Sequence, residues 1–271
     1  NPKQALQYAN QALELCDKKV YPVKSPSFNR VRLKAEAYHT IGEIYRLLGN
    51  YPLAMQNHLN ALNIHEELND RKRMEASYNN IAIIYWQQGE YPRALKYYFD
   101  ALNICEKIKQ EHPDDRRNQK SMANTYNNVG AIYDVRGEYK LALEYYFKAL
   151  EIKEKFNDKK AIANTYGNIA SVFYYQGKIE KSLEFDNKAL NIRQKIGDIR
   201  GIAMSYINIG ETYTELAKND TTSDKYKKFE QALDYQHKAL EIQKELEDKY
   251  TMTYSLLGIG NVYMAQGRSP L

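Results

Sequence analysis

The chain has 271 residues, of which 43% are hydrophobic and 27% are charged, which is enough apolar material to bury a large interior. Its formal net charge of +5 comes from 39 basic and 34 acidic residues, and the basic runs are short, which argues against nucleic-acid binding. No apolar stretch is long enough to span a membrane, and the two cysteines, Cys16 and Cys105, are too few and too far apart for a disulfide framework.

The first predicted element is a helix over residues 2–17. Its pairs Ala5-Leu6 and Ala12-Leu13 match the second half of a motif that then returns along the chain. The chain begins without Met inside this half-motif and stops shortly after another one. We therefore expect it to be a segment excised from a larger protein, in which targeting or membrane segments have been removed.

After this helix, one motif recurs six times: a Tyr or Leu, then an Ile or Val next to Gly or Ala, then an aromatic residue. Its Ile or Val stands at intervals of 40, 48, 40, 40 and 50 residues. A fixed period of this size is the signature of a solenoid. The six copies are Ile41-Gly42, Ile81-Ala82, Val129-Gly130, Ile169-Ala170, Ile209-Gly210 and Ile259-Gly260. The intervals predict repeats over about 28–68, 71–110, 116–156, 159–196 and 199–247, with a last partial repeat over 250–267.

Each repeat has the pattern of two helices joined by a turn. In the third repeat, Tyr126, Val129 and Tyr133 stand at i, i+3 and i+7, on one face of a helix. Gly137 follows, and glycine lets the chain reverse because it tolerates a positive φ at a helix C-terminus. The sequence therefore predicts an all-α array of antiparallel helix pairs, with helices of ~17 residues that are roughly 25 Å long.

Two insertions interrupt the period. One adds eight residues around 110–118 and contains Pro113, and the other adds ten residues around 219–228 that are rich in Thr, Ser, Asp and Lys. We expect both to elaborate the connecting turns at the surface.

These half-motifs resemble the tetratricopeptide repeat over nearly the whole chain. In the first full repeat the matching residues are Gly42, Tyr45, Gly49, Tyr51, Ala54 and Ala61, and equivalents follow in the later repeats. The chain departs from the pattern in its opening Tyr instead of Trp, in the missing Pro after the second helix, and in a period of 40 instead of 34. This long variant resembles arrays in kinesin light chains, spindle-orientation scaffolds, Rap-type peptide-sensing regulators and bacterial sensor kinases and cyclases. The resemblance implies a single right-handed α-α superhelix over residues 1–271.

Asparagine recurs just before the Ile or Val in four successive repeats, although Asn is a poor residue for a helix interior. These four residues, called the ladder asparagines below, are Asn80, Asn128, Asn168 and Asn208. Asn124 and Asn164 precede two of them by four residues and so share their helix face. The resemblance implies that the first helix of each repeat lines a concave groove, where an Asn at this position bonds the backbone of an extended peptide. A carboxamide suits that task because it offers one acceptor and two donors.

A structural interpretation stays open beside this one. Buried polar groups usually find partners within the protein, so the ladder asparagines could instead bond neighbouring helices. The same applies to Trp86, Asp134 and Tyr174, which stand six residues after a ladder asparagine. They could line the groove or belong to a variable solvated face. Glu43 and Glu211 could add acidic contacts towards the two ends of the groove.

The sequence contains no pattern that predicts catalysis, a cofactor or a metal site. His58 and His65 share a helix face at i and i+7 but have no third ligand nearby in the sequence, so we expect ordinary helix histidines. The predicted function is a non-catalytic module that binds a protein or peptide, with no nucleic acid and no direct membrane contact. The alternative is the sensory or dimerising region of a larger bacterial signalling protein, such as a histidine kinase, a nucleotide cyclase or a transcription regulator, which would allow a homodimer. We expect a cytoplasmic location, or a periplasmic one if a signal peptide has been removed.

Overall fold

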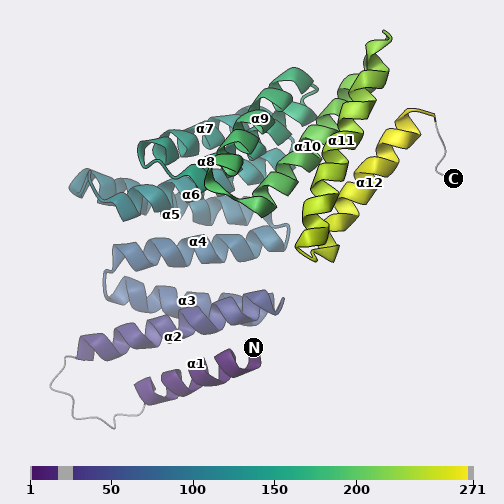
Figure 1. Ribbon diagram of the computed structural model, residues 1–271. Helices are drawn as coiled ribbons and strands as arrows, with labels where there is room; N and C mark the ends of the chain where they lie inside the picture. The colour runs from purple at the N-terminus through teal and green to yellow at the C-terminus, as the bar shows by residue number, and fades with distance from the viewer. Residues whose placement is uncertain (1, 18–26, 268–271) are drawn as a thin grey trace. The chain divides into compact units, whose positions relative to one another are not determined.

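The computed structural model describes residues 2–17 and 27–267, which form twelve α-helices and no strand (Figure 1). The helices are α1 (Pro2–Asp17), α2 (Ser27–Leu47), α3 (Tyr51–Glu67), α4 (Arg71–Gln87), α5 (Tyr91–Glu111), α6 (Arg116–Val135), α7 (Tyr139–Lys155), α8 (Lys159–Tyr175), α9 (Ile179–Ile196), α10 (Ile199–Lys218), α11 (Asp224–Glu245) and α12 (Lys249–Ala265). This confirms the predicted all-α fold of successive helix pairs. None of these helices combines the length and the apolar character that a membrane span requires.

The chain divides into two compact units, residues 1–132 and 133–271, and the boundary falls near the end of α6. Each unit is described by itself. In the first unit α2 packs on α3 and α4 on α5, while in the second α8 packs on α9 and α10 on α11. The predicted organisation as one solenoid domain stays a prediction.

Glycines close the turns inside the helix pairs, as the sequence predicts. Gly49, Gly89, Gly137 and Gly177 have φ values of 72–76°, in the left-handed region that a side chain would disfavour. The turns between repeats use the same conformation at Asn69, Asn157, Gly197 and Glu247. The next helix is then capped by an Asp whose side chain accepts a backbone N–H, as Asp158 does from Ala161 at 3.2 Å. Local chemistry therefore fixes where each helix begins and ends.

Small residues bring the helices close together, and tyrosines fill the edges between them. Ala54, Ala94, Ala142 and Ala232, one in each of four second helices, are fully buried. Around them, a second-helix aromatic side chain packs against rings of its own first helix. Tyr97 lies 6.0 Å from Tyr78 and 5.5 Å from Tyr85, and Tyr235 lies 5.7 Å from Tyr206 and from Tyr213, measured between ring centroids. These half-buried positions suit tyrosine because the ring packs while the hydroxyl stays near water.

The two insertions differ from the expected surface turns because much of their length is helical. Part of the first extends α5 to Glu111, where buried Ile108 continues the apolar stripe, and the connection to α6 is only residues 112–115. Much of the second joins α11, whose Phe229 packs with Ala217 of α10 and Val262 of α12. The apolar side chains extend these helices because they gain burial there.

Candidate functional site

Two buried columns of variable side chains run along the second helices of the repeats. The first column stands three residues before the Ala of the recurring Ala-Leu pair, and every member is at most 2% exposed. Its members are His58, Tyr98, Tyr146, Asp186 and Gln236. The second column stands four residues after the same Ala, and its members are His65, Cys105, Lys153, Arg193 and Gln243. The sequence analysis missed both columns, and the signal that could have found them is this constant offset from Ala-Leu.

Three members of the second column bond the next repeat, whereas the buried side-chain amide of Gln243 has no hydrogen-bond partner among the residues that the structure describes. His65 Nδ1 lies 3.1 Å from Ser77 Oγ, Lys153 Nζ donates to Thr165 Oγ1 at 2.7 Å, and Arg193 Nη1 donates to Ser205 Oγ at 2.7 Å. Each hydroxyl belongs to the first helix of the following repeat. Because these contacts join buried polar groups on adjacent helices, His65, Lys153 and Arg193 are structural elements of the joints.

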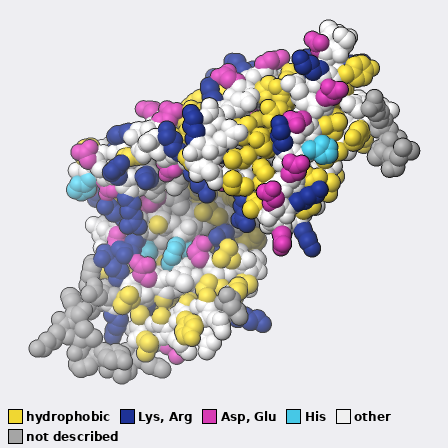
Figure 2. All heavy atoms as spheres, in the orientation of Figure 1, with side chains coloured by type: hydrophobic (Ala, Val, Ile, Leu, Met, Phe, Trp, Pro, Cys, Tyr) yellow, Lys and Arg dark blue, Asp and Glu magenta, His cyan; other side chains and the backbone are white. Residues whose placement is uncertain are grey.

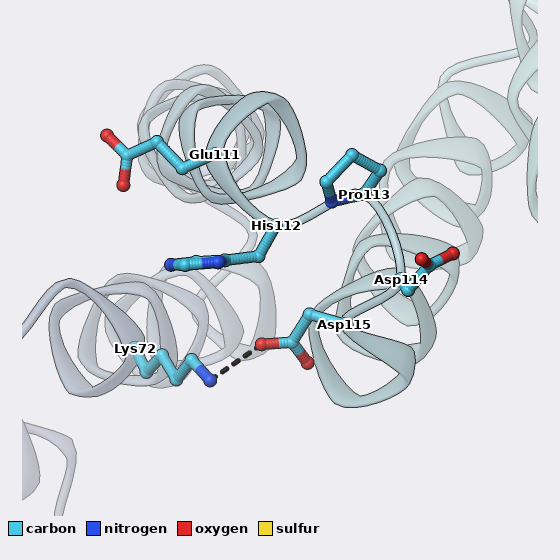
Figure 3. A pocket seen from close by; sticks show the side chains of 6 residues that line it. All are labelled: Lys72, Glu111, His112, Pro113, Asp114 and Asp115. Atoms are coloured by element: carbon cyan, nitrogen blue, oxygen red, sulfur yellow. Dashed lines mark ion pairs between the residues drawn. The ribbon is translucent and has the colours of Figure 1, made fainter.

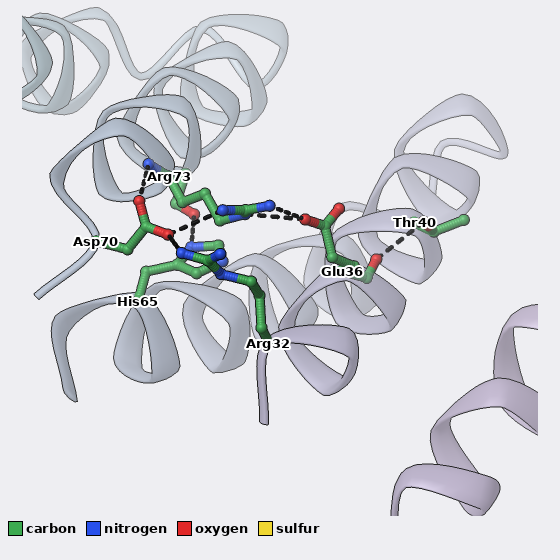
Figure 4. A network of polar contacts seen from close by, with 7 residues as sticks. Arg32, Glu36, Thr40, His65, Asp70 and Arg73 are labelled. Carbon is green, nitrogen blue, oxygen red and sulfur yellow. Dashed lines mark hydrogen bonds and ion pairs between the residues drawn. The ribbon is translucent and has the colours of Figure 1, made fainter. Parts of the chain in front are cut away.

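Figure 4 shows the joint at His65 in the first unit, where charged side chains surround the start of α4. Asp70, the cap of α4, pairs with Arg32 of α2 at 2.7 Å and with Arg73 at 2.9 Å. Arg73 also pairs with Glu36 of α2 at 2.8 Å. This network connects successive first helices, α2 and α4, and its carboxylates already have cationic partners.

The ladder asparagines are half-buried, and three have contacts to neighbouring helices that identify their partners. Asn80 Nδ2 lies 3.2 Å from His39 Nδ1, whose ring stands edge-on to that of His58. The side chain of Asn128 bonds the buried Tyr98 hydroxyl, and Asn208 Nδ2 lies 3.4 Å from Asp186 Oδ1. Asn168 is half-buried on α8. Asn128 and Asn208 thus bond members of the first column.

The other predicted groove residues have different surroundings. Asn124 of α6 is exposed, and exposed Asn164 of α8 accepts a hydrogen bond from Arg193 Nη2 at 3.1 Å. Trp86 is 40% exposed on α4. Asp134 of α6 is half-buried, and burial raises its pKa to about 6. Tyr174 of α8 is half-buried.

A cavity of about 190 Å³ in the second unit brings Tyr174 and Asn208 together. Ser171, Tyr174 and Tyr175 of α8 form one wall, and Asn208, Glu211 and Thr212 of α10 form the other. Its floor is α9, which packs against both helices and contributes Ser182 and Asp186, at most 2% exposed.

The cavity is associated with the shortest side chain of the first column. The equivalent positions carry His, Tyr, Tyr and Gln, and these longer side chains extend further from α3, α5, α7 and α11. Gln236, for example, reaches the backbone of α10, where its Nε2 donates to Ile207 O at 3.2 Å. Asp186 ends two bonds from its Cβ, and the space above it is unfilled. We attribute the hollow to this shortening.

The cavity holds one buried carboxyl group, Asp186, and a second one, Glu211, which is exposed at the rim and only partly desolvated. Burial raises the pKa of Asp186 to about 7, although the hydrogen bond from Asn208 opposes the shift, and burial also raises the pKa of Glu211 at the rim. Within residues 27–267, no lysine or arginine forms an ion pair with either carboxyl group. Arg193 of the same helix instead donates to Ser205, Gly201 O and Asn164. A carboxyl group perturbed by burial in a cavity, as Asp186 is, marks a candidate site.

A second hollow, of about 530 Å³, lies beside the turn between α5 and α6 (Figure 3). Lys72, Glu111, His112, Pro113, Asp114 and Asp115 line it. Most of these residues are exposed, and Lys72 already pairs with Asp115 at 2.6 Å. In the part of the chain that the structure describes, no group of three His, Cys, Asp or Glu residues could hold a metal ion. This hollow is therefore an open surface depression, and none of the residues that line it is buried.

The sequence matches a family model described as tetratricopeptide repeat over residues 33–107, 121–195 and 161–221. Comparison with curated proteins gives no match.

Several solved structures share the fold. BtubC (BKLC) from P. vanneervenii has a TM-score of 0.72 at 20% identity, and the alignment covers 91% of this chain and 92% of that one. A signal transduction ATPase with numerous domains from Pyrococcus horikoshii, described as having a tetratricopeptide repeat sensor, has a TM-score of 0.71 at 20% identity, covering 99% of this chain and 40% of that one. A Rap protein solved in complex with Competence and Sporulation Factor has a TM-score of 0.58 at 17% identity, covering 96% of this chain and 72% of that one.

Proposed function

This chain belongs to the tetratricopeptide repeat family, and from that premise we propose that it is a non-catalytic module that binds a segment of a partner protein beside the cavity between α8 and α10. Repeats of this family are generally protein-interaction modules. The observation that carries the proposal is the cavity itself, a polar hollow whose walls are two successive first helices. The Rap protein complexed with Competence and Sporulation Factor supports the idea that such an array can hold a partner.

The segment would bind in an extended conformation. Asn168 and Asn208 occupy equivalent positions on α8 and α10, so two carboxamides follow one another along the wall helices. Asn208 gives one N–H to Asp186, and its carboxamide carries a second N–H and an acceptor oxygen with two lone pairs. This donor and acceptor set matches the N–H and C=O of a peptide backbone. In the first unit, Asn80 and Asn128 are predicted to act in the same way.

The test is a selection of binders from a display library of extended eight-residue peptides, followed by measurement of the selected peptides against variants. We expect wild type to bind the selected peptides. The double variant Asn168→Ala/Asn208→Ala should bind them at least about tenfold more weakly, because each hydrogen bond lost to a buried backbone costs about 1–3 kcal/mol. Asn191→Ala, at an exposed position of α9, is the matched control and should bind normally.

Circular dichroism separates the two interpretations of the ladder asparagines. If the double variant keeps its melting temperature while it loses the peptides, the carboxamides serve the partner. If it melts much earlier, or if wild type selects no peptide, the ladder is structural and the proposal fails.

A second candidate function is the sensory region of a larger signalling protein. It is favoured by the Pyrococcus horikoshii protein, in which the similar array is described as a sensor. The alignment covers only 40% of that longer protein. The full-length gene decides this candidate, which requires an effector domain in the same open reading frame.

A further inference from the structure

We propose that the cavity between α8 and α10 receives a positively charged side chain, Lys or Arg, of the partner segment. The proposal deepens the proposed function, because it names the chemistry that one residue of the partner must have. It rests on the contents of the cavity and on the absence of an internal cation within residues 27–267.

The first argument is charge. Asp186 at the floor is 2% exposed and faces the hollow from α9, while Glu211 stands at its rim on α10. An unpaired carboxylate in such a place is costly to ionise, and the usual compensation is a nearby cation. In the first unit, Asp70 has such cations in Arg32 and Arg73, whereas the buried carboxyl group of Glu75 is instead bonded by Ser121 and Asn79. In the second unit, the cation of α9 whose charge acts on Asp186 is Arg193, which is occupied by Ser205, Gly201 and Asn164, while Lys188 pairs with Glu184.

The second argument is shape. The cavity has a volume of about 190 Å³, which suits one side-chain head group and is too small for a folded element. Tyr174 and Tyr175 contribute rings whose centroids lie 5.6 Å apart and whose planes meet at 84°. Aromatic faces attract cations, so these rings would hold the aliphatic stem and the charge of an entering side chain. Carboxylate, ring and amide together form the set that a guanidinium or ammonium group requires.

The site also makes binding depend on pH. The groups that face Asp186 are Tyr174 and Tyr175 from α8, and Asn208, Glu211 and Thr212 from α10, with Glu215 bonded to Tyr174 and Arg193 further along α9. With these neighbours, burial holds the pKa of Asp186 near 7, so its carboxyl group is largely protonated at pH 5.5 and ionised at pH 8.5. A cation should therefore bind better at the higher pH.

The test uses two capped single residues, N-acetyl-arginine methylamide and its uncharged isostere N-acetyl-citrulline methylamide, titrated into the chain and followed by NMR. We expect the arginine probe to shift the side-chain amide signals of Asn208, and the citrulline probe to leave them in place. The arginine shift should weaken about tenfold from pH 8.5 to pH 5.5 and should be lost in Asp186→Asn, because a tenfold change corresponds to one charge-assisted contact. Glu180→Gln, an exposed carboxylate of the same helix outside the cavity, removes the same charge and should leave binding unchanged.

Equal shifts with both probes, or an arginine shift that persists unchanged in Asp186→Asn, would overturn the inference. The single-residue probes do not need the peptide groove, so their outcome is independent of the peptide selection. Selected peptides that bind wild type without any preference for Lys or Arg would also overturn the inference, while the proposed function would stand.

Discussion

The burial of Asp186 lowers the stability of the folded chain at neutral and higher pH. A carboxyl group ionises poorly when burial removes its water, and burial raises the pKa of Asp186 from its ordinary value of 3.8 to about 7. A carboxyl group whose pKa is higher in the folded state than in the unfolded state contributes its full stability below the unfolded-state pKa. That contribution is lost as the pH rises through the folded-state pKa. At pH 8 the loss amounts to about 4 kcal/mol, at about 1.4 kcal/mol for each unit of pKa.

Replacing this carboxyl group should therefore stabilise the chain without a partner. We expect Asp186→Asn to raise the free energy of unfolding by up to about 4 kcal/mol at pH 8 and by much less at pH 4, where the native carboxyl is already protonated in the folded state. Urea unfolding at both pH values measures the difference, with Glu180→Gln as control. A variant that is less stable than wild type at pH 8 would contradict this account of the site.

At the scale of elements, the small residues of α2 and α10, Gly42 and Gly210, are matched to the first-column side chains that lie upon them. A Cβ added to Gly42 would stand 2.8 Å from His58 Nε2, and one added to Gly210 would stand 2.7 Å from Gln236 Nε2. His58 is fully buried, so its ring has no free space into which to retreat. The Ile-Gly motif therefore indicates close helix packing. The buried first-column side chain that contacts the glycine decides whether a larger residue can replace it.

A pair of glycine substitutions tests this matching. Gly42→Ala should lower the free energy of unfolding by about 1–3 kcal/mol, because the added methyl group overpacks the contact with His58. In Gly260→Ala of α12 the added methyl group has no other atom within 4 Å. This substitution should raise the free energy of unfolding by about 0.5–1 kcal/mol, because alanine is the better helix former. Denaturant titration followed by circular dichroism measures both. Equal effects of the two substitutions would refute the role of His58.

At the scale of the whole molecule, stability should be distributed along the chain. Within residues 2–17 and 27–267 the helices contact chiefly their neighbours in the sequence. In such arrays stability is approximately a sum of repeat terms and nearest-neighbour terms. Acidic and basic side chains both occur over the visible face (Figure 2).

Local unfolding should reflect this arrangement. We expect Gly42→Ala to speed amide hydrogen exchange in α2 and α3 at least about tenfold, which corresponds to a loss of about 1.4 kcal/mol, and to leave α10 and α11 unchanged. Hydrogen–deuterium exchange with mass spectrometry of wild type and variant measures the effect segment by segment. The same acceleration in α10 and α11 would show that the chain unfolds as one cooperative unit.

The sequence by itself determined the repeat, because a helix pair depends on residues near one another: the Ile-Gly motif at 41–42, the turn at Gly49 and the cap at Asn50 all act within one repeat. It also indicated Asn208, Tyr174 and Glu211, since their positions recur with the period. Only the tertiary structure showed that these three side chains surround Asp186, which looks in the sequence like any polar residue of a surface helix. The contact between Asn208 and Asp186 joins residues 22 positions apart on different helices. Whether such a side chain is buried, what it bonds and whether it leaves a cavity depend on the packing of three helices, which no local pattern records.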